Sequence, residues 1–215
     1  MVFHVLNRGV GRMNLFTKAG DFDAFERYVE KTLESCPMRI CAYCLLPNHF
    51  HMVLWPERDG DLGAFMQKLS VTHVRNWQEH RHRVGYGHVY QGRYKSFPVE
   101  TDDYFYQVVR YVERNALRAG LAEAAEAWRW GSRWWRECGE PVECRWLSWP
   151  LPVPRNWKEL VNEPQFEAEL EAIRRSVVKG QPYGREAWAR QTAAELGLES
   201  TFRSRGRPKR DEITL

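Results

Sequence analysis

The fold is decided by the stretch LLPNHFHMVLW, Leu45–Trp55, in which two apolar runs meet at a turn signal. The first run is Met38–Leu46 and the second is Phe50–Trp55. Pro47–Asn48 separates them, and both residue types are common in tight turns. The stretch therefore predicts a β-hairpin of two strands.

The second strand carries two histidines with one apolar residue between them. Alternate residues of a strand share a face, so His49 and His51 project to one side. The other side is formed by Phe50, Met52 and Leu54. We expect the apolar side to face helices and the imidazoles to lie on the open face, close enough to share one divalent ion. Two partly exposed histidines that only decorate the sheet are the alternative.

Elements on either side of this hairpin alternate in type. Val2–Arg8 predicts a strand, and Asp21–Ser35 predicts a helix because its apolar residues recur at helical spacing. After the hairpin, Asp61–His82 predicts a long helix, Val89–Val99 a strand and Thr101–Ala119 a third helix. The order βαββαβ followed by a helix predicts an α+β fold with a ferredoxin-like antiparallel sheet and one added helix.

Composition indicates a globular protein. The chain has 215 residues, 43% of them hydrophobic, which is enough for one sizeable core and a smaller accessory unit. No apolar run approaches the roughly 18 residues of a membrane span, and the first residues lack the apolar block of a secretory signal. We therefore expect a cytoplasmic protein with no membrane partner. The five cysteines are expected as reduced thiols, with a zinc site seeded by Cys41 and Cys44 as the alternative.

Positive charge is unevenly distributed along the chain, whose net charge is +4. Basic residues outnumber acidic residues within 1–136 and 203–215, whereas acidic residues outnumber basic ones within 137–202. This pattern suits an anionic polymer such as DNA, because lysine and arginine gain affinity by displacing counterions from phosphates. Solubility alone is the other explanation for a charge of this size.

The last third of the chain is expected to form smaller units. We divide it into a tryptophan- and proline-rich linker at 136–163, a helical accessory unit at 164–200 and a basic tail at 201–215. The accessory unit holds two expected helices, Pro164–Val178 and Arg185–Leu196. Their short, glycine-containing connection allows a helix-turn-helix.

The basic tail contains SRGRPKR, Ser204–Arg210. Its Arg-Gly-Arg-Pro core resembles that of an AT-hook, in which an extended arginine-glycine-arginine unit lies in the narrow minor groove of A·T-rich DNA. Arg205 and Arg207 would make these contacts. A disordered basic tail with only nonspecific affinity for DNA is the alternative.

Four segments within residues 1–135 carry a family resemblance. They are FHVLNRGVGRMNLF (Phe3–Phe16), AYCLLPNHFHMVLWP (Ala42–Pro56), GHVYQGRYKSFPV (Gly87–Val99) and YVERNALRAGL (Tyr111–Leu121). In order and spacing they resemble the single-tyrosine HUH transposases of the insertion-sequence-200 type, and particularly the REP-associated tyrosine transposases of bacteria. HUH denotes His-hydrophobic-His, which here reads His49-Phe50-His51. Members often carry a basic stretch before the first strand, and this chain begins almost inside that strand.

The resemblance implies that residues 1–135 form a catalytic domain that cleaves single-stranded DNA. A tyrosine hydroxyl attacks the scissile phosphate, which forms a 5′-phosphotyrosine link and frees a 3′-hydroxyl, so strand joining needs no ATP. Mg²⁺ or Mn²⁺ is the metal expected from the family, held by His49 and His51, where it would polarise the phosphate. Hairpin-forming repeats bound as single strands are the expected substrate.

The nucleophile implied by the resemblance is Tyr111. In the family it lies in the helix after the last strand, in a segment like Y-[IV]-x-x-N-P-x-x-x-G, which this chain matches from Tyr111 to Gly120 with Ala116 in place of the proline. Asn115 lies four residues after Tyr111 and so on the same helix face, and we predict that its amide oxygen is a third metal ligand. The alternative is that Tyr111 only packs in the core while Asn115 caps a nearby turn.

Basic residues near these positions are candidates for DNA binding. Arg110, Arg114 and Arg118 recur every four residues along the tyrosine helix and predict a basic stripe beside its active face. Arg93 and Lys95, which precede that helix, are further candidates. Any one of them could instead be an ordinary solvated charge.

The sequence thus predicts a DNA transposase-type enzyme, and two other functions stay open. A sequence-specific DNA-binding regulator would use the same basic surface without needing Tyr111 or the histidines. A replication initiator or relaxase of the HUH superfamily would share the chemistry, although such proteins tend to have larger domains and attached helicase modules. Monomer and homodimer both stay open, because some relatives exchange the tyrosine helix between subunits whereas REP-associated members can work as monomers.

Overall fold

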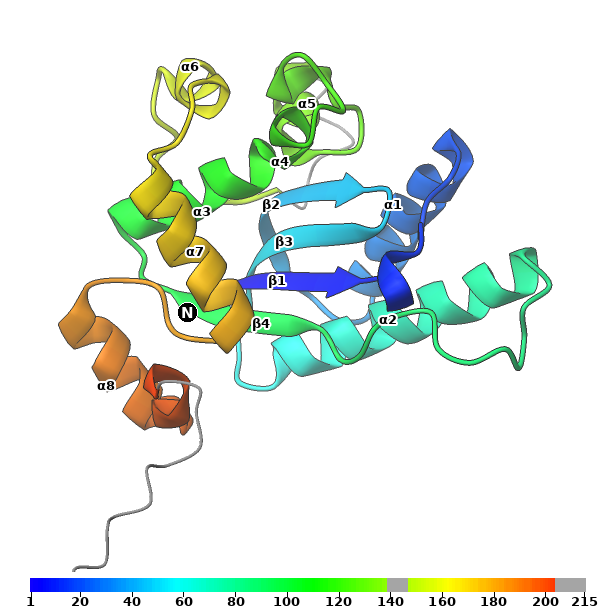
Figure 1. Ribbon diagram of the computed structural model, residues 1–215, viewed down its shortest axis with the longest axis horizontal. Helices are drawn as coiled ribbons and strands as arrows, with labels where there is room; N and C mark the ends of the chain where they lie inside the picture. The colour runs from blue at the N-terminus through cyan, green and yellow to red at the C-terminus, as the bar shows by residue number, and fades with distance from the viewer. Residues whose placement is uncertain (139–146, 204–215) are drawn as a thin grey trace, which may run out of the picture.

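An antiparallel sheet forms the centre of the molecule. The computed structural model describes residues 1–138 and 147–203, and within them four strands follow the order β2-β3-β1-β4 (Figure 1). The strands are β1 (Val2–Arg8), β2 (Arg39–Leu46), β3 (His49–Trp55) and β4 (Lys95–Val99). This order is that of a ferredoxin-like sheet, so the predicted fold class and hairpin are confirmed.

The first face of the sheet is covered by the two crossover helices, α1 (Ala19–Leu33) and α2 (Asp61–His80). Phe50, Met52 and Leu54 of β3 point into this core, as strand alternation predicts. The helices contribute Phe22, Phe25, Val29, Phe65, Met66 and Leu69. Because every second residue of β3 is buried in this core, the register of β3 is fixed, and its histidines project to the opposite face.

The second face is also covered, which corrects the expectation that the histidines lie on an open face. Two helices, α3 (Asp103–Glu113) and α4 (Asn115–Arg118), pack across it. The apolar residues that α3 buries are Phe105, Val108, Val109 and Val112. Only 3% of His51 is exposed. The expectation was wrong because α3 is itself amphipathic and buries its apolar side on the sheet face that α1 and α2 leave free.

Two predicted elements are shorter than expected. Val89–Val99 contains only the short β4, preceded by an isolated bridge at Tyr90. Gly92 lies between the two pieces, where a glycine weakens a strand. The helix predicted at Thr101–Ala119 is divided into α3 and α4 at Arg114, whose side chain bonds another helix. Such a tertiary contact overrides helix propensity and leaves no trace in the periodicity of the sequence.

Short helical segments make up much of the rest of the described chain. They are η1 (Val10–Arg12), η2 (Ala125–Ala127), α5 (Ser132–Cys138), α6 (Trp157–Asn162), α7 (Glu167–Lys179), α8 (Glu186–Leu196) and η3 (Glu199–Phe202), where η denotes a 3₁₀ helix. The two helices predicted in the accessory unit are therefore present as α7 and α8, and α6 lies within the predicted linker.

The connection between α7 and α8 binds the edge of the sheet. The N–H of Tyr183 donates to the carbonyl of Pro98 at 2.9 Å, and the N–H of Glu100 donates to the carbonyl of Tyr183 at 2.9 Å. Arg185 then forms an ion pair with the buried Glu100. Helix α7 packs on β4 and α3 (Figure 1). The accessory helices are therefore packed onto the sheet domain, while the domain boundaries and the helix-turn-helix stay predictions.

Glu113, the last residue of α3, is a buried junction between three helices. Ser132 Oγ of α5 donates to its Oε1 at 2.8 Å, and Trp157 Nε1 of α6 donates to its Oε2 at 2.8 Å. Arg136 Nε lies 3.5 Å from Oε1. A buried carboxylate needs such partners, so α5 and α6 together hold the end of α3 in place.

The substitution Trp157→Phe keeps an aromatic ring at this junction but removes the indole donor. We expect the free energy of unfolding to fall by about 1–3 kcal/mol, because the Glu113 carboxylate is left short of a partner. Urea denaturation measures the change. Trp134→Phe is the matched control, since the described residues offer the Trp134 indole N–H no hydrogen-bond partner. Equal losses in the two variants would contradict the role given to the Glu113 contact.

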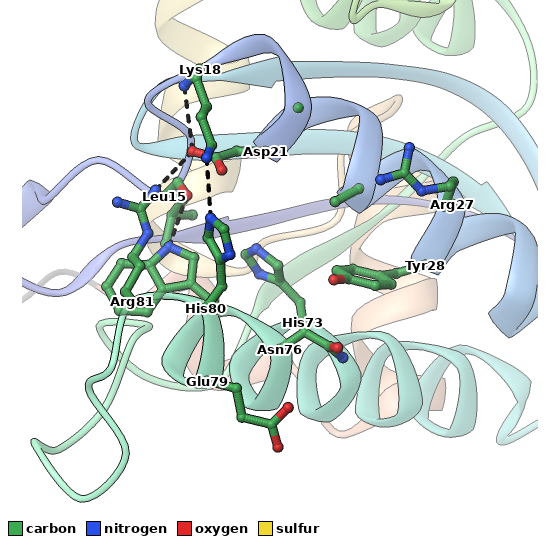
Figure 2. A pocket seen from close by; sticks show the side chains of 13 residues that line it. Leu15, Lys18, Asp21, Arg27, Tyr28, His73, Asn76, Glu79, His80 and Arg81 are labelled. Carbon is green, nitrogen blue, oxygen red and sulfur yellow. Dashed lines mark hydrogen bonds and ion pairs between the residues drawn. The ribbon is translucent and has the colours of Figure 1, made fainter.

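His73 of α2 is a buried histidine on the other side of the sheet, beside a hollow of about 440 Å³ between α1 and α2 (Figure 2). Its Nδ1 lies 2.6 Å from the hydroxyl of Tyr90, and the rings of Phe16 and Phe25 pack against it. Burial lowers the pKa of His73 from 6.5 to about 3. The imidazole is therefore neutral in the folded protein at neutral and mildly acidic pH.

Acid should destabilise the fold through His73. Below pH 6.5 the unfolded chain protonates this histidine, whereas the folded protein does not until about pH 3, so its contribution to stability is lost as the pH falls through that window. Between about pH 7.5 and about pH 5, we expect wild type to lose about 2 kcal/mol more than His73→Gln, which can bond Tyr90 but cannot titrate. Urea denaturation at both pH values gives the difference. If the exposed-site control His88→Gln behaves like His73→Gln, the effect does not come from His73.

Candidate active site

Three histidines and a tyrosine meet between β1, β3 and α3. The ring centroids of His49 and His51 on β3 are 5.1 Å apart. The ring of Tyr111 on α3 is edge-on to His51, with 5.7 Å between centroids. His4 on β1 lies 5.0 Å from His51 and 6.2 Å from Tyr111 by the same measure. The structure therefore brings the predicted histidine pair and the predicted nucleophile together.

His4 is a member of this cluster that sequence reasoning does not identify. Antiparallel pairing places it opposite Val53 on the histidine face of the sheet, and its ring stacks on Phe97 of β4 with 4.8 Å between centroids. A signal for it is present in VFHVLNR, because His4, Leu6 and Arg8 alternate and must share one face. Only the register of β1 against β3 shows that this face is the one that carries the other histidines.

Hydrogen bonds leave one nitrogen free on each histidine of the pair. Asn48 Oδ1 lies 2.6 Å from His49 Nδ1, so this nitrogen carries the proton and Nε2 carries the lone pair. His51 Nδ1 lies 2.9 Å from His4 Nε2. When His51 donates this bond, its Nε2 also presents a lone pair. Two such nitrogens on one strand face fit the donor set that a divalent metal takes from imidazoles.

Burial keeps these imidazoles neutral. It lowers the pKa of His4 to about 3 and that of His49 to about 4, and it holds the pKa of His51 well below 6.5. The positive charges of Arg8 and Arg118 lower the pKa of both His49 and His51 further. Protonation would occupy the lone pairs, so a depressed pKa keeps them available at neutral pH.

In the described part of the chain, no further acidic, cysteine or histidine ligand completes the pair. Within residues 1–138 and 147–203, no group of three or more His, Cys, Asp or Glu side chains is arranged to hold a metal ion. Remaining ligands would have to be amide oxygens, water or substrate oxygens. Cys41 and Cys44 are buried free thiols, and burial raises the pKa of each to about 12, which disfavours the thiolate that zinc needs.

Arg118 links the predicted nucleophile to the predicted third ligand. Its guanidinium carbon lies 4.1 Å from the centroid of the Tyr111 ring, a cation–π contact. Its Nη2 donates to Asn115 Oδ1 at 2.7 Å. The same oxygen would have to bind the metal, and a carbonyl oxygen has a second lone pair for this. The role of Asn115 as a metal ligand stays a prediction.

The predicted basic stripe is divided by the structure. Arg110 Nη2 donates to the carbonyl of Glu163 at 2.9 Å, and Arg114 Nη1 donates to the carbonyl of Val161 at 3.1 Å. These two guanidinium groups donate hydrogen bonds at the end of α6, where the last carbonyls lack partners within the helix. Arg118 alone of the three lies against Tyr111. A contact of Arg110 or Arg114 with DNA stays a prediction.

The remaining basic candidates lie at two different places. Arg93 and Lys95 are exposed and line a hollow of about 280 Å³ with Arg8 of β1. Arg205 and Arg207, predicted to form the AT-hook-like contacts, lie outside the described residues.

Residues 1–115 match the family model described as "Transposase IS200 like". The matched segment includes the histidine pair and Tyr111, and it covers more than half of the chain. The chain belongs to the IS200-like transposase family. No curated protein matches it. The family makes it a DNA-processing enzyme by descent.

Solved structures were compared with this IS200-like transposase. A REP-associated tyrosine transposase bound to a REP hairpin matches with a TM-score of 0.52 at 17% sequence identity, over 77% of this chain and 92% of that one. A candidate transposase from Deinococcus radiodurans R1 matches with a TM-score of 0.41 at 14% identity, over 53% of this chain and 88% of that one. The first match supports the four-stranded α+β fold. No described helix is both long and apolar enough to cross a membrane.

Proposed function

We propose that this IS200-like transposase cuts and rejoins single-stranded DNA through Tyr111. The observation that carries the proposal is the placement of the Tyr111 ring 5.7 Å from His51, on a face that also holds His49. A phenol beside two neutral imidazoles, one on a buried and one on a partly buried strand residue, has the components needed for attack on a phosphodiester. The hairpin carried by the REP-associated relative makes hairpin DNA the substrate that we propose.

The reaction would proceed by exchange of one ester for another. The Tyr111 oxygen attacks the phosphorus, the bond from phosphorus to the 3′ oxygen breaks, and a 5′-phosphotyrosine link forms. The proton lost by the phenol is balanced by the proton that the 3′ oxygen gains. Reversal with a second 3′-hydroxyl rejoins the strands, and the number of ester bonds is unchanged throughout.

His49 and His51 would hold a divalent ion, for which we propose Mg²⁺ or Mn²⁺. Their free Nε2 atoms and depressed pKa values fit this role. When bound, the ion would supply charge that polarises the phosphate. Imidazole ligands suit Mn²⁺ better than Mg²⁺, so Mn²⁺ is the better probe of the site. Tyr111 meets His51, the neighbour of His49, within a single chain, so we propose that a monomer suffices for cleavage.

A denaturing gel tests the chemistry directly. Labelled hairpin oligonucleotides from the flanks of the gene are incubated with protein and Mg²⁺ or Mn²⁺, and a covalent protein–DNA band is expected with wild type. Tyr111→Phe should abolish this band, and His49→Ala/His51→Ala should reduce it by at least about 100-fold. Tyr104→Phe, on the same helix, is the matched control and should cleave normally.

Other outcomes of the gel identify the alternatives. Cleavage that persists in Tyr111→Phe would show that the nucleophile is another residue. Binding of the hairpin by every variant, with no cleavage by any, would favour a sequence-specific DNA-binding regulator.

The His4 contact predicts an effect on metal affinity that does not depend on cleavage. His4→Phe keeps an aromatic ring against Phe97 but removes the partner of His51 Nδ1, and we expect about 10- to 100-fold weaker Mn²⁺ binding. Isothermal titration with Mn²⁺ measures it. His4→Gln, which can restore a hydrogen bond to Nδ1, should recover part of the affinity. Unchanged affinity in His4→Phe would remove His4 from the site.

A further inference from the structure

We propose that Arg8 and Arg118 bind two successive phosphates of the DNA strand, one on each side of the histidine pair. Arg118 would hold the phosphate that Tyr111 attacks. Arg8 would hold the neighbouring phosphate, and the hollow beside Arg8 would receive the attached nucleotide. The inference rests on the proposed function for the identity of the ligand.

The two arginines approach the histidine pair from different elements. In the register of β1 against β3, Arg8 lies directly opposite His49, so the two side chains share the site face. Arg118 ends α4 and covers the ring of Tyr111 at 4.1 Å. Tyr111 in turn lies edge-on to His51, with 5.7 Å between ring centroids, so each arginine adjoins one member of the histidine pair or its tyrosine neighbour.

Within residues 1–138 and 147–203, neither arginine is paired with a carboxylate. Nε of Arg8 and Nη1 of Arg118 are buried without a hydrogen-bond partner in the described part of the chain. Arg118 bonds the neutral amide of Asn115 and lies against the side chain of Tyr111, and within the same residues neither guanidinium group forms a salt bridge. An unpaired buried donor on a cation is costly, so these groups are expected to have an anionic partner.

Other arginines of the molecule show the contrast. In the hollow between α1 and α2, Arg81 is paired with Asp21 at 2.8 Å (Figure 2). Several further arginines have a buried nitrogen without a partner, but each also bonds a carboxylate or a backbone carbonyl through the same guanidinium. They are Arg39, Arg110, Arg133 and Arg136. Among the described residues, the lack of a carboxylate or backbone carbonyl partner therefore sets the guanidinium groups of Arg8 and Arg118 apart.

The hollow beside Arg8 has the charge and size for one nucleotide. Its volume is about 280 Å³, and Arg93 and Lys95 line it together with Arg8, while its other polar side chains are the neutral Asn7 and Gln91. This volume is close to the lower limit of small-molecule sites, about 300 Å³, so the hollow has room for no more than a single nucleotide. A planar guanidinium can give a phosphate two hydrogen bonds, which favours a phosphodiester over an apolar ligand.

A binding assay without metal and without the Tyr111 hydroxyl tests the phosphate clamp, by which we mean Arg8 and Arg118 together. Tyr111→Phe is the parent protein, and its affinity for a labelled hairpin with a single-stranded flank is measured by fluorescence anisotropy in EDTA at several salt concentrations. Adding Arg8→Gln or Arg118→Gln should weaken binding about 3- to 30-fold and reduce the salt slope by about 0.7 each. Arg58→Gln is the matched control. It removes the same charge, but Arg58 is exposed and lies beyond the end of β3 that is farther from His49.

Single methylphosphonate substitutions locate the two phosphates. Each replaces one charged phosphate of the oligonucleotide by a neutral group, and in the parent protein two adjacent positions should weaken binding most. At one of them the methylphosphonate should remove the difference between Arg8→Gln and the parent, and at the other it should do so for Arg118→Gln. Additive effects at every position, a loss with Arg58→Gln as large as the others, or no binding by the parent would overturn the proposal.

Two further results keep the clamp separate from folding and from cleavage. Arg8→Lys retains the charge, so it should restore the salt slope without the full affinity, whereas a misfolded site would restore neither. If an arginine substitution and a methylphosphonate have non-additive effects on binding, but wild type does not cleave the DNA, the two-phosphate contact is upheld and the proposed chemistry is rejected. If wild type cleaves through Tyr111, but the two kinds of change have additive effects on binding at every position, the proposed chemistry is upheld and the two-phosphate contact is rejected.

Discussion

The candidate site depends on one buried carboxylate, that of Glu113, and on the hydrogen bonds that it accepts. Tyr111 meets His51 because α3 crosses the second face of the sheet, and the end of α3 is held by Ser132 and Trp157 through the Glu113 carboxylate. Both donors lie beyond residue 115, where the match to the IS200-like family model ends. The later part of the chain therefore supports the position of the predicted nucleophile, although the match to the family model covers only residues before it.

Burial also decides the chemical state of the histidines. On an open sheet face, imidazoles would titrate near neutral pH and would often be protonated. Under α3 they are desolvated, and the positive charges of Arg8 and Arg118 add to the same effect. A pair of neutral imidazoles then shares one site with two guanidinium groups that have no carboxylate partner among the described residues. Such a site suits a ligand that brings its own negative charge, which is the character of a phosphodiester backbone.

The arginines show how far charge patterns in a sequence can be trusted. Arg110, Arg114 and Arg118 have identical spacing, yet two of them bond carbonyls at the end of α6 and one covers Tyr111. Arg8 has no regular pattern around it and lies opposite His49. The partner of a long side chain depends on what packs within its reach, and helical periodicity carries no information about that.

The sequence by itself determined the order of the elements, the hairpin, the shared face of His49 and His51, and the family, because strand alternation and helical spacing are local properties of the chain. Through the family motif it also predicted Tyr111 as the nucleophile. Only the tertiary structure decided that the histidine face is buried, that His4 joins the pair, and that α3 ends at Glu113. These features depend on strand register and on helices that come from distant parts of the chain, and such contacts form because apolar faces and buried charges need partners wherever in the sequence those partners lie.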